Sequence, residues 1–91
     1  MSGRLPTIDQ LKEYLCEEYD CRWEAFSRQH DGKTLHGGIF RRGEGPDEVD
    51  APYLTDEIGA KVSGHVIRRI CKDLGIPPAE VFDWFERQSL N

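Results

Sequence analysis

The sequence predicts a small α+β domain, with a three-stranded antiparallel sheet and helices packed on one face, in the order α-β-β-β-α(-α). Three observations predict it. Apolar residues recur at helical spacing near both ends of the chain. Strand-like segments in the middle are separated by glycine-rich turns. Helices on one face of a sheet bury all these apolar stripes together. The 91 residues form one domain, 1–91.

The first helix is predicted to start just after Leu5-Pro6. Thr7 and Gln10 have the spacing of a capping box, in which each side chain accepts a backbone N–H of the other residue. Apolar residues then follow at helical spacing, at Ile8, Leu11 and Leu15. We expect this helix to fray near Asp20.

The strand region begins with alternating residues over 21–27. Asp31-Gly32 is a strong signal for a tight hairpin turn, so residues 35–42 form the return strand. A flexible acidic loop follows, and residues 49–54 form a third strand at an edge, because Pro52 cannot complete a ladder. If Leu35 and Ile39 face the helices, then His36, Gly38 and Phe40 face away.

The second helix carries a broad apolar stripe, which consists of Val62, Val66, Ile67, Ile70, Cys71 and Leu74. Gly75 is placed to end it in the left-handed conformation, with Ile76 as the apolar residue just beyond. Pro77-Pro78 starts a short third helix that docks through Val81, Phe82 and Phe85. The expected core contains Trp23, Ile39, Val66, Ile70 and Leu74.

Composition indicates a soluble cytoplasmic protein. Hydrophobic residues make up 37% and charged residues 32%, and no apolar run approaches the length of a membrane span or a signal peptide. We expect no contact with a membrane. The net charge of -5 argues against indiscriminate binding of nucleic acid. Basic residues nevertheless concentrate in two islands, residues 22–42 and 58–74, and residues 43–57 are acidic.

Three cysteines are present, at positions 16, 21 and 71. Without an export signal we expect free thiols, because an odd number leaves one unpaired in any disulfide scheme. The alternative is a zinc site formed by Cys16, Cys21 and a histidine, but the spacing is loose and no second close pair exists. We therefore predict no metal and no cofactor.

The segment around His36 is the strongest candidate site. His36 precedes Gly37-Gly38, which leave the backbone accessible, and an outward Phe40 would stack on bases. The expected phosphate contacts are Arg28, Lys33, Arg41 and Arg42. A neutral imidazole at His36 would then act as general base toward a ribose 2′-OH. The alternative is that His36 is a surface residue with no special role; His30 and His65 are expected to face solvent.

The order of elements, together with "TLHGGIFRR" and "VIRRICKDLGIPPAEVF", resembles the HicA toxins of bacterial type II toxin–antitoxin systems. These are small mRNA interferases with a double-stranded-RNA-binding-like fold. The resemblance implies RNA as a partner, a cognate antitoxin, and His36 at the position of the catalytic histidine, with no metal required. The chain departs from the family in its acidic total and in the residues flanking that histidine.

Two further hypotheses remain. The chain is alternatively a non-catalytic protein-interaction module, such as an inhibitor, adaptor or immunity-type protein, that uses an acidic surface including residues 44–50. A DNA-binding role for Arg68-Arg69 is weaker, because the same helix supplies the core. The oligomeric state is not determined by the sequence.

Overall fold

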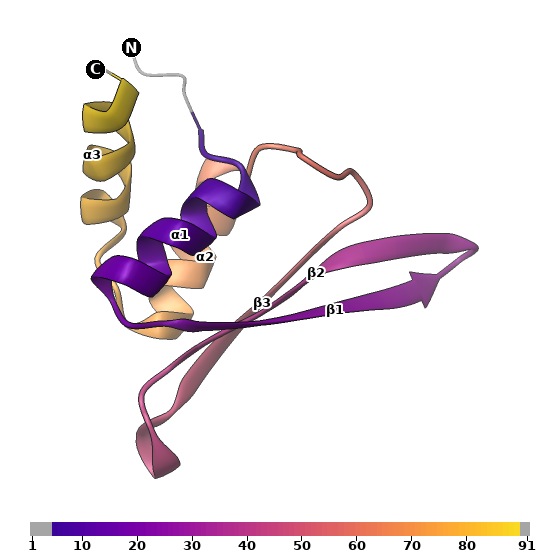
Figure 1. Ribbon diagram of the computed structural model, residues 1–91, viewed down its shortest axis with the longest axis horizontal. Helices are drawn as coiled ribbons and strands as arrows, with labels where there is room; N and C mark the ends of the chain where they lie inside the picture. Colours follow the sequence, from indigo (N-terminus) through magenta and orange to yellow (C-terminus); the bar gives the residue numbers. More distant parts are fainter. Residues whose placement is uncertain (1–4, 90–91) are drawn as a thin grey trace.

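The computed structural model describes residues 5–89 and confirms the α+β fold and its order of elements. Three helices lie over one end of the sheet, and the first hairpin projects beyond them (Figure 1). The elements are α1 (Ile8–Glu18), β1 (Arg22–His30), β2 (Lys33–Arg42), the short 3-10 turn η1 (Gly45–Asp47), β3 (Val49–Thr55), α2 (Gly64–Leu74) and α3 (Pro78–Ser89).

Local signals in the sequence set most element boundaries. The capping box is present: the Thr7 N–H donates to Oε1 of Gln10 at 2.9 Å, and the Gln10 N–H donates to the Thr7 hydroxyl at 3.3 Å. Asp31 and Gly32 both have positive φ and join β1 to β2 in a two-residue turn. Gly75 has φ 72° and ends α2, as predicted.

The sheet has the order β1-β2-β3, with both pairs antiparallel and β2 in the centre. Trp23, Phe40 and Ala51 stand side by side across the three strands and face the helices. Phe40 is completely buried, and its ring centroid lies 4.6 Å from that of Trp23. This row of three residues anchors the sheet to the helical layer.

The predicted orientation of β2 is wrong. Leu35 and Ile39 point away from the helices, and Phe40 points into the core, so Ile39 does not join the buried cluster. The neighbouring strands explain the difference: Phe40 lies between Trp23 and Ala51, whereas Ile39 lies between Glu24 and Pro52. Only the first of these rows is apolar enough to be buried.

The remaining core predictions hold. Ile70 and Leu74 are fully buried, and Trp23 and Val66 are half-buried against the same cluster. The helical layer is joined to the sheet by Arg42, whose guanidinium donates to the carbonyl oxygens of Leu74 (2.8 Å) and Gly75 (3.2 Å) at the C-terminus of α2.

The orientation of β2 predicts a large difference between two phenylalanines. Phe40→Ala should lower the free energy of unfolding by ~3–5 kcal/mol, because a fully buried ring is lost. Phe26→Ala, on the opposite face, should cost only ~1 kcal/mol, because that ring is half-buried. Urea unfolding of both variants measures the difference. Equal losses would show that the two faces have been assigned incorrectly.

The buried thiols predict selective labelling. Burial raises the pKa of all three thiols, and it raises those of Cys21 and Cys71 to about 11. Cys16, which is half-buried on α1, is the most accessible of the three. Since the thiolate is the reactive form, at pH 8 a thiol reagent should modify Cys16 in the native protein and all three cysteines after unfolding. Mass spectrometry of labelled peptides identifies the sites, and rapid native labelling of Cys71 would contradict its place in the core.

Candidate functional site

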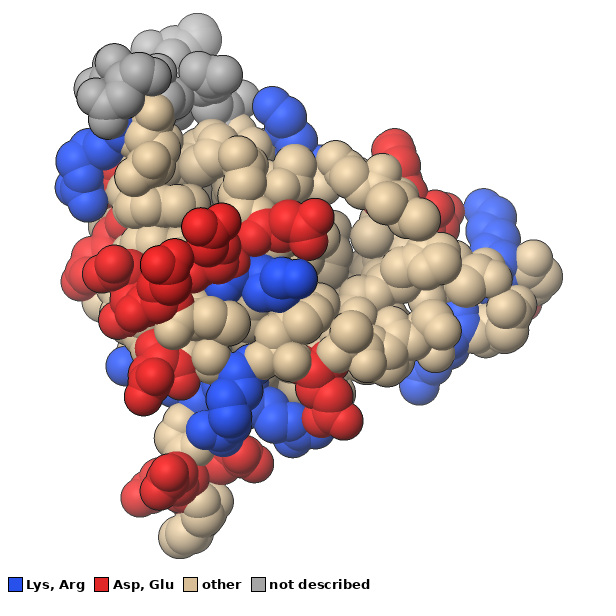
Figure 2. All heavy atoms as spheres, in the orientation of Figure 1, with Lys and Arg blue, Asp and Glu red and all other residues tan. Residues whose placement is uncertain are grey.

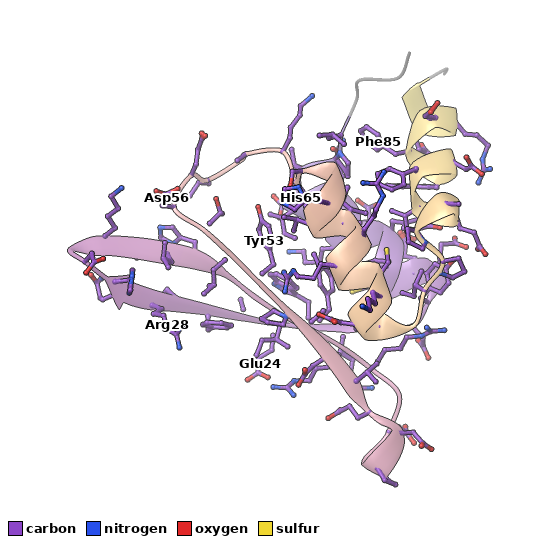
Figure 3. All side chains as sticks on the ribbon, turned by 180° about the vertical axis from the view of Figure 1, so that it is seen from behind. Glu24, Arg28, Tyr53, Asp56, His65 and Phe85 are labelled. Atoms are coloured by element: carbon purple, nitrogen blue, oxygen red, sulfur yellow. The ribbon has the colours of Figure 1, made fainter. Side chains whose placement is uncertain are left out.

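The residues predicted to bind RNA lie on two different faces of the sheet. His36 points to the helix side, where it stands between Ser27 and Thr55 on the projecting hairpin. Arg28 and Arg41 point to the opposite side. Figure 3 shows this division: Glu24 and Arg28 extend away from α2, while Tyr53 extends toward it. The strands therefore do not bring the imidazole and these two guanidiniums together.

Two of the predicted RNA-binding residues are held inside the fold. Phe40 was expected to be an exposed stacking ring, and this expectation is wrong because its side chain is fully buried. Arg42 binds the end of α2, and its guanidinium carbon also lies 5.3 Å from the centre of the Tyr19 ring. Phe40 is therefore not exposed for stacking, and the guanidinium of Arg42, which is partly buried, is bound to the end of α2.

The other basic residues of the hairpin are largely neutralised. Arg41 pairs with Glu24 at 3.2 Å and with Asp50 at 3.7 Å. Lys33 lies 3.7 Å from Asp56. Arg28 is exposed and forms no ion pair within residues 5–89. The basic island of the sequence thus becomes a surface of mixed charge.

The glycine pair after His36 has a packing role. A Cβ at Gly38 would overlap the carbonyl oxygen of Glu24 on β1 and lie 2.7 Å from Cζ2 of Trp23, whose ring covers this position. At Gly37, where φ is 157°, a Cβ would overlap the carbonyl oxygen of Tyr53 on β3. Strand pairing continues without a bulge through both positions. The two glycines therefore allow β2 to approach its neighbours on either side.

The predicted acidic surface at residues 44–50 is partly used within the chain. Glu48 accepts a hydrogen bond from Arg22 at 2.6 Å, and Asp50 pairs with Arg41. Glu44 and Asp47 stay exposed on the turn between β2 and β3. This segment therefore offers two carboxylates to a partner, in a loop with no buried residues.

A more developed acidic surface lies between α1 and α3. Figure 2 shows a band of carboxylates that crosses the molecule over α1. A groove of about 380 Å³ opens beside it. The carboxylates of Glu13, Glu17 and Glu18 line this groove together with the rings of Tyr14, Trp84 and Phe85 and the amides of Gln10 and Gln88.

The rings of the groove are held in place by contacts between the two helices. Tyr14 is buried and stacks on Trp84 with centroids 4.1 Å apart and planes inclined by 22°. The Tyr19 hydroxyl donates a 2.6 Å hydrogen bond to Oε1 of Glu80 on α3. That hydrogen bond is the main reason why the pKa of Tyr19 is raised. Figure 3 shows Phe85 on the side of α3 that faces the other helices.

The carboxylates of the groove are not neutralised by the described chain. Glu13 and Glu17 are exposed, stand four residues apart on one face of α1, and form no ion pair within residues 5–89. The same holds for Glu18. The only cation on α1, Lys12, pairs with Asp9 and lies over Trp23 instead. Burial raises the pKa of Tyr14, and the charge of Arg87 on α3 partly opposes this rise, but Arg87 does not line the groove.

Sequence patterns alone did not identify this groove. The Glu13–Glu17 spacing marks a charged face of a helix, which usually means only exposure to solvent. Trp84 was not predicted to line a binding site, because the third helix was expected to dock on the core through Phe82 and Phe85. The groove depends on the stacking of Tyr14 on Trp84, a contact between opposite ends of the chain.

The remaining chemistry-bearing groups do not form a second centre. The three histidines lie apart: His30 contacts Asp31 at the hairpin tip, His36 lies on the sheet, and His65 is exposed near the start of α2 (Figure 3). Among residues 5–89, no three potential ligands gather where they could hold a metal ion. Within the same range no helix has both the length and the apolar character needed to cross a membrane.

Comparison of the chain with protein-family models, curated proteins and solved structures finds no match.

The packing role of the glycines predicts a contrast between two substitutions. Gly38→Ala should destabilise the protein by ~1–3 kcal/mol, because the new methyl group would clash with the backbone carbonyl oxygen of Glu24 and with the Trp23 ring. Gly64→Ala is the matched control: its Cβ meets nothing closer than 3.8 Å, and alanine favours the helix by up to ~1 kcal/mol. Thermal unfolding measures both, and a Gly38→Ala variant as stable as wild type would refute the packing argument.

Proposed function

We propose that this protein is a non-catalytic protein-interaction module that binds a basic segment of a partner protein in the groove between α1 and α3. One observation carries the proposal: three aromatic rings and three carboxylates that form no ion pair within residues 5–89 line the same groove. Such a module would belong with the inhibitors, adaptors and immunity-type proteins that act through an acidic surface.

Lysine and arginine side chains fit the chemistry of this groove. Their charged heads would pair with Glu13 and Glu17, and their aliphatic stems would lie on the rings of Trp84 and Phe85. A guanidinium over the indole of Trp84 would add a cation–π contact. Charge would guide the approach of the partner and the rings would supply buried apolar area, so binding should weaken as salt is added.

The RNA-directed hypothesis has less support from the site. His36 and the exposed Arg28 point to opposite faces, Arg41 and Lys33 are paired with carboxylates, and the chain as a whole carries a charge of -5. A phosphate backbone would meet no concentrated positive surface here. Cleavage of mRNA with His36 as general base, and a cognate antitoxin, remain predictions of the family resemblance.

The groove predicts binding of a cationic amphipathic peptide. A fluorescein-labelled synthetic peptide rich in arginine and leucine should bind the wild type, and a version with glutamate in place of arginine should not. Glu13→Lys/Glu17→Lys should weaken binding by about tenfold or more, because two attractive charges become repulsive. Fluorescence anisotropy measures the affinity, and Trp84→Leu tests the contribution of the indole.

Two controls separate this function from its alternatives. Glu44→Lys/Asp47→Lys makes the same change of charge in the exposed turn, and it should leave peptide binding nearly unchanged. If this variant loses binding instead, the acidic turn is the interface and the groove is not. Wild type and His36→Ala should both leave total RNA intact at low salt; cleavage by the wild type alone would overturn the non-catalytic proposal.

A further inference from the structure

The outer edge of β1 is an open strand edge. β1 pairs with β2 on one side over all nine of its residues, without a bulge, and within residues 5–89 no other strand of the sheet lies on its other side. Sheet edges are usually protected by charged side chains, lysine above all, by a proline, an inward-pointing charge, a bulge, a very short strand, or a covering helix or loop. β1 contains no proline, lysine or bulge, no charge stands on its helix-facing side, and its outward charges are of both signs, at Arg22, Glu24 and Arg28. Such an edge is able to add another strand.

The turn determines which backbone groups point outward. The positive φ of Asp31 and Gly32 is typical of a two-residue hairpin turn, which makes His30 and Lys33 a hydrogen-bonded pair. Hydrogen-bonded and non-hydrogen-bonded pairs alternate along an antiparallel ladder. Residues 23, 25, 27 and 29 therefore direct their N–H and C=O groups toward the open edge, where a new strand would bind them.

The side chains of β1 are complementary to a second copy of β1. If two copies pair antiparallel with Phe26 opposite Phe26, then Glu24 of each copy lies opposite Arg28 of the other. Ala25 lies opposite Ser27, so the two hydrogen-bonding positions next to the centre carry small side chains. The carboxylate of Glu24 contacts Arg41 through Oε1, which leaves Oε2 for the second copy. Arg28 forms no ion pair within residues 5–89 and is available.

Only this register pairs the whole strand. Centring the pair on Phe26 matches Arg22 with His30 and uses all nine residues of both strands. A shift toward Glu24 or Arg28 leaves the ends unpaired, and centring on either residue places two like charges opposite each other. The strand therefore specifies its own two-fold register through the length of β1 and the order of its charges.

We propose that two copies of this protein associate through antiparallel pairing of their β1 strands, forming a continuous six-stranded sheet. The two-fold axis passes between the two Phe26 residues, and the interface is self-complementary, as in most homodimers. Both helical layers then lie on the same side of the sheet. Each groove between α1 and α3 stays open, so dimer formation is independent of the peptide-binding proposal.

A charge-exchange experiment tests both the interface and its register. Sedimentation velocity of the wild type over a range of concentrations should show a monomer–dimer equilibrium. Glu24→Arg places two pairs of arginines opposite each other, and Arg28→Glu does the same with glutamates. Each variant alone should raise the dimer dissociation constant by about tenfold or more. Mixed in equal amounts, the two variants should form a heterodimer in which both pairs are again of opposite charge.

Lys61→Glu is the control, because it reverses an exposed charge away from β1 and should not affect association. Circular dichroism of every variant checks that it is folded. A wild type that is monomeric at all concentrations overturns the proposal. So does a dimer that persists in both single variants, and so does a mixture that stays monomeric while its components are folded.

A cross-link provides a test that does not depend on charge. Phe26→Cys in a Cys16→Ser background places two thiols directly opposite each other at the two-fold axis, a separation that a disulfide can bridge. Oxidation should convert this variant into a covalent dimer on a non-reducing gel. Gln29→Cys in the same background is the control, because its symmetry mate lies at the other end of the interface. Equal cross-linking of both variants would contradict the register.

Discussion

The contact of Trp23 with Phe40, made beside the bare backbone of Gly38, determines which face of the central strand is buried. Phe40 is completely buried, and the Trp23 ring covers the position where any other residue would place its Cβ. A shift of β2 by one residue would expose Phe40 and bring Ile39 and Arg41 beneath the helices. The positions of Arg28, Arg41 and His36 all follow from this one choice of face.

The boundaries of the helices and strands could be predicted from the sequence, whereas the buried face of β2 could not. The start of α1, the hairpin turn and the end of α2 depend on neighbouring residues, so Thr7, Asp31-Gly32 and Gly75 located them correctly. The burial of one face of β2 depends on what stands on β1 and β3. The segment itself offered Leu35 and Ile39 on one face and, with His36 and Gly38, only Phe40 on the other, so the larger apolar count suggested the wrong face.

The candidate site was harder to predict than the fold for the same reason. Basic residues that cluster in the sequence are separated by the alternation of the strands and paired with carboxylates from β1, β3 and the segment after β3. The acidic groove is formed instead by residues that appear unremarkable alone. The groove combines carboxylates on α1 with rings on α3. The spacing of residues within either helix does not show that the two helices lie together.

The two walls of the groove come from segments far apart in the chain: Tyr14 and Glu80, which form one of the contacts between them, are 66 positions apart. Holding α3 against α1 closes a loop that contains the entire sheet and α2, and closing so long a loop has a cost in chain entropy. A partner that binds both walls would therefore stabilise the contact between α1 and α3. It would raise the melting temperature, and this rise would continue as its free concentration increases beyond its dissociation constant. It would also slow the fraying of α3 more than that of the projecting hairpin.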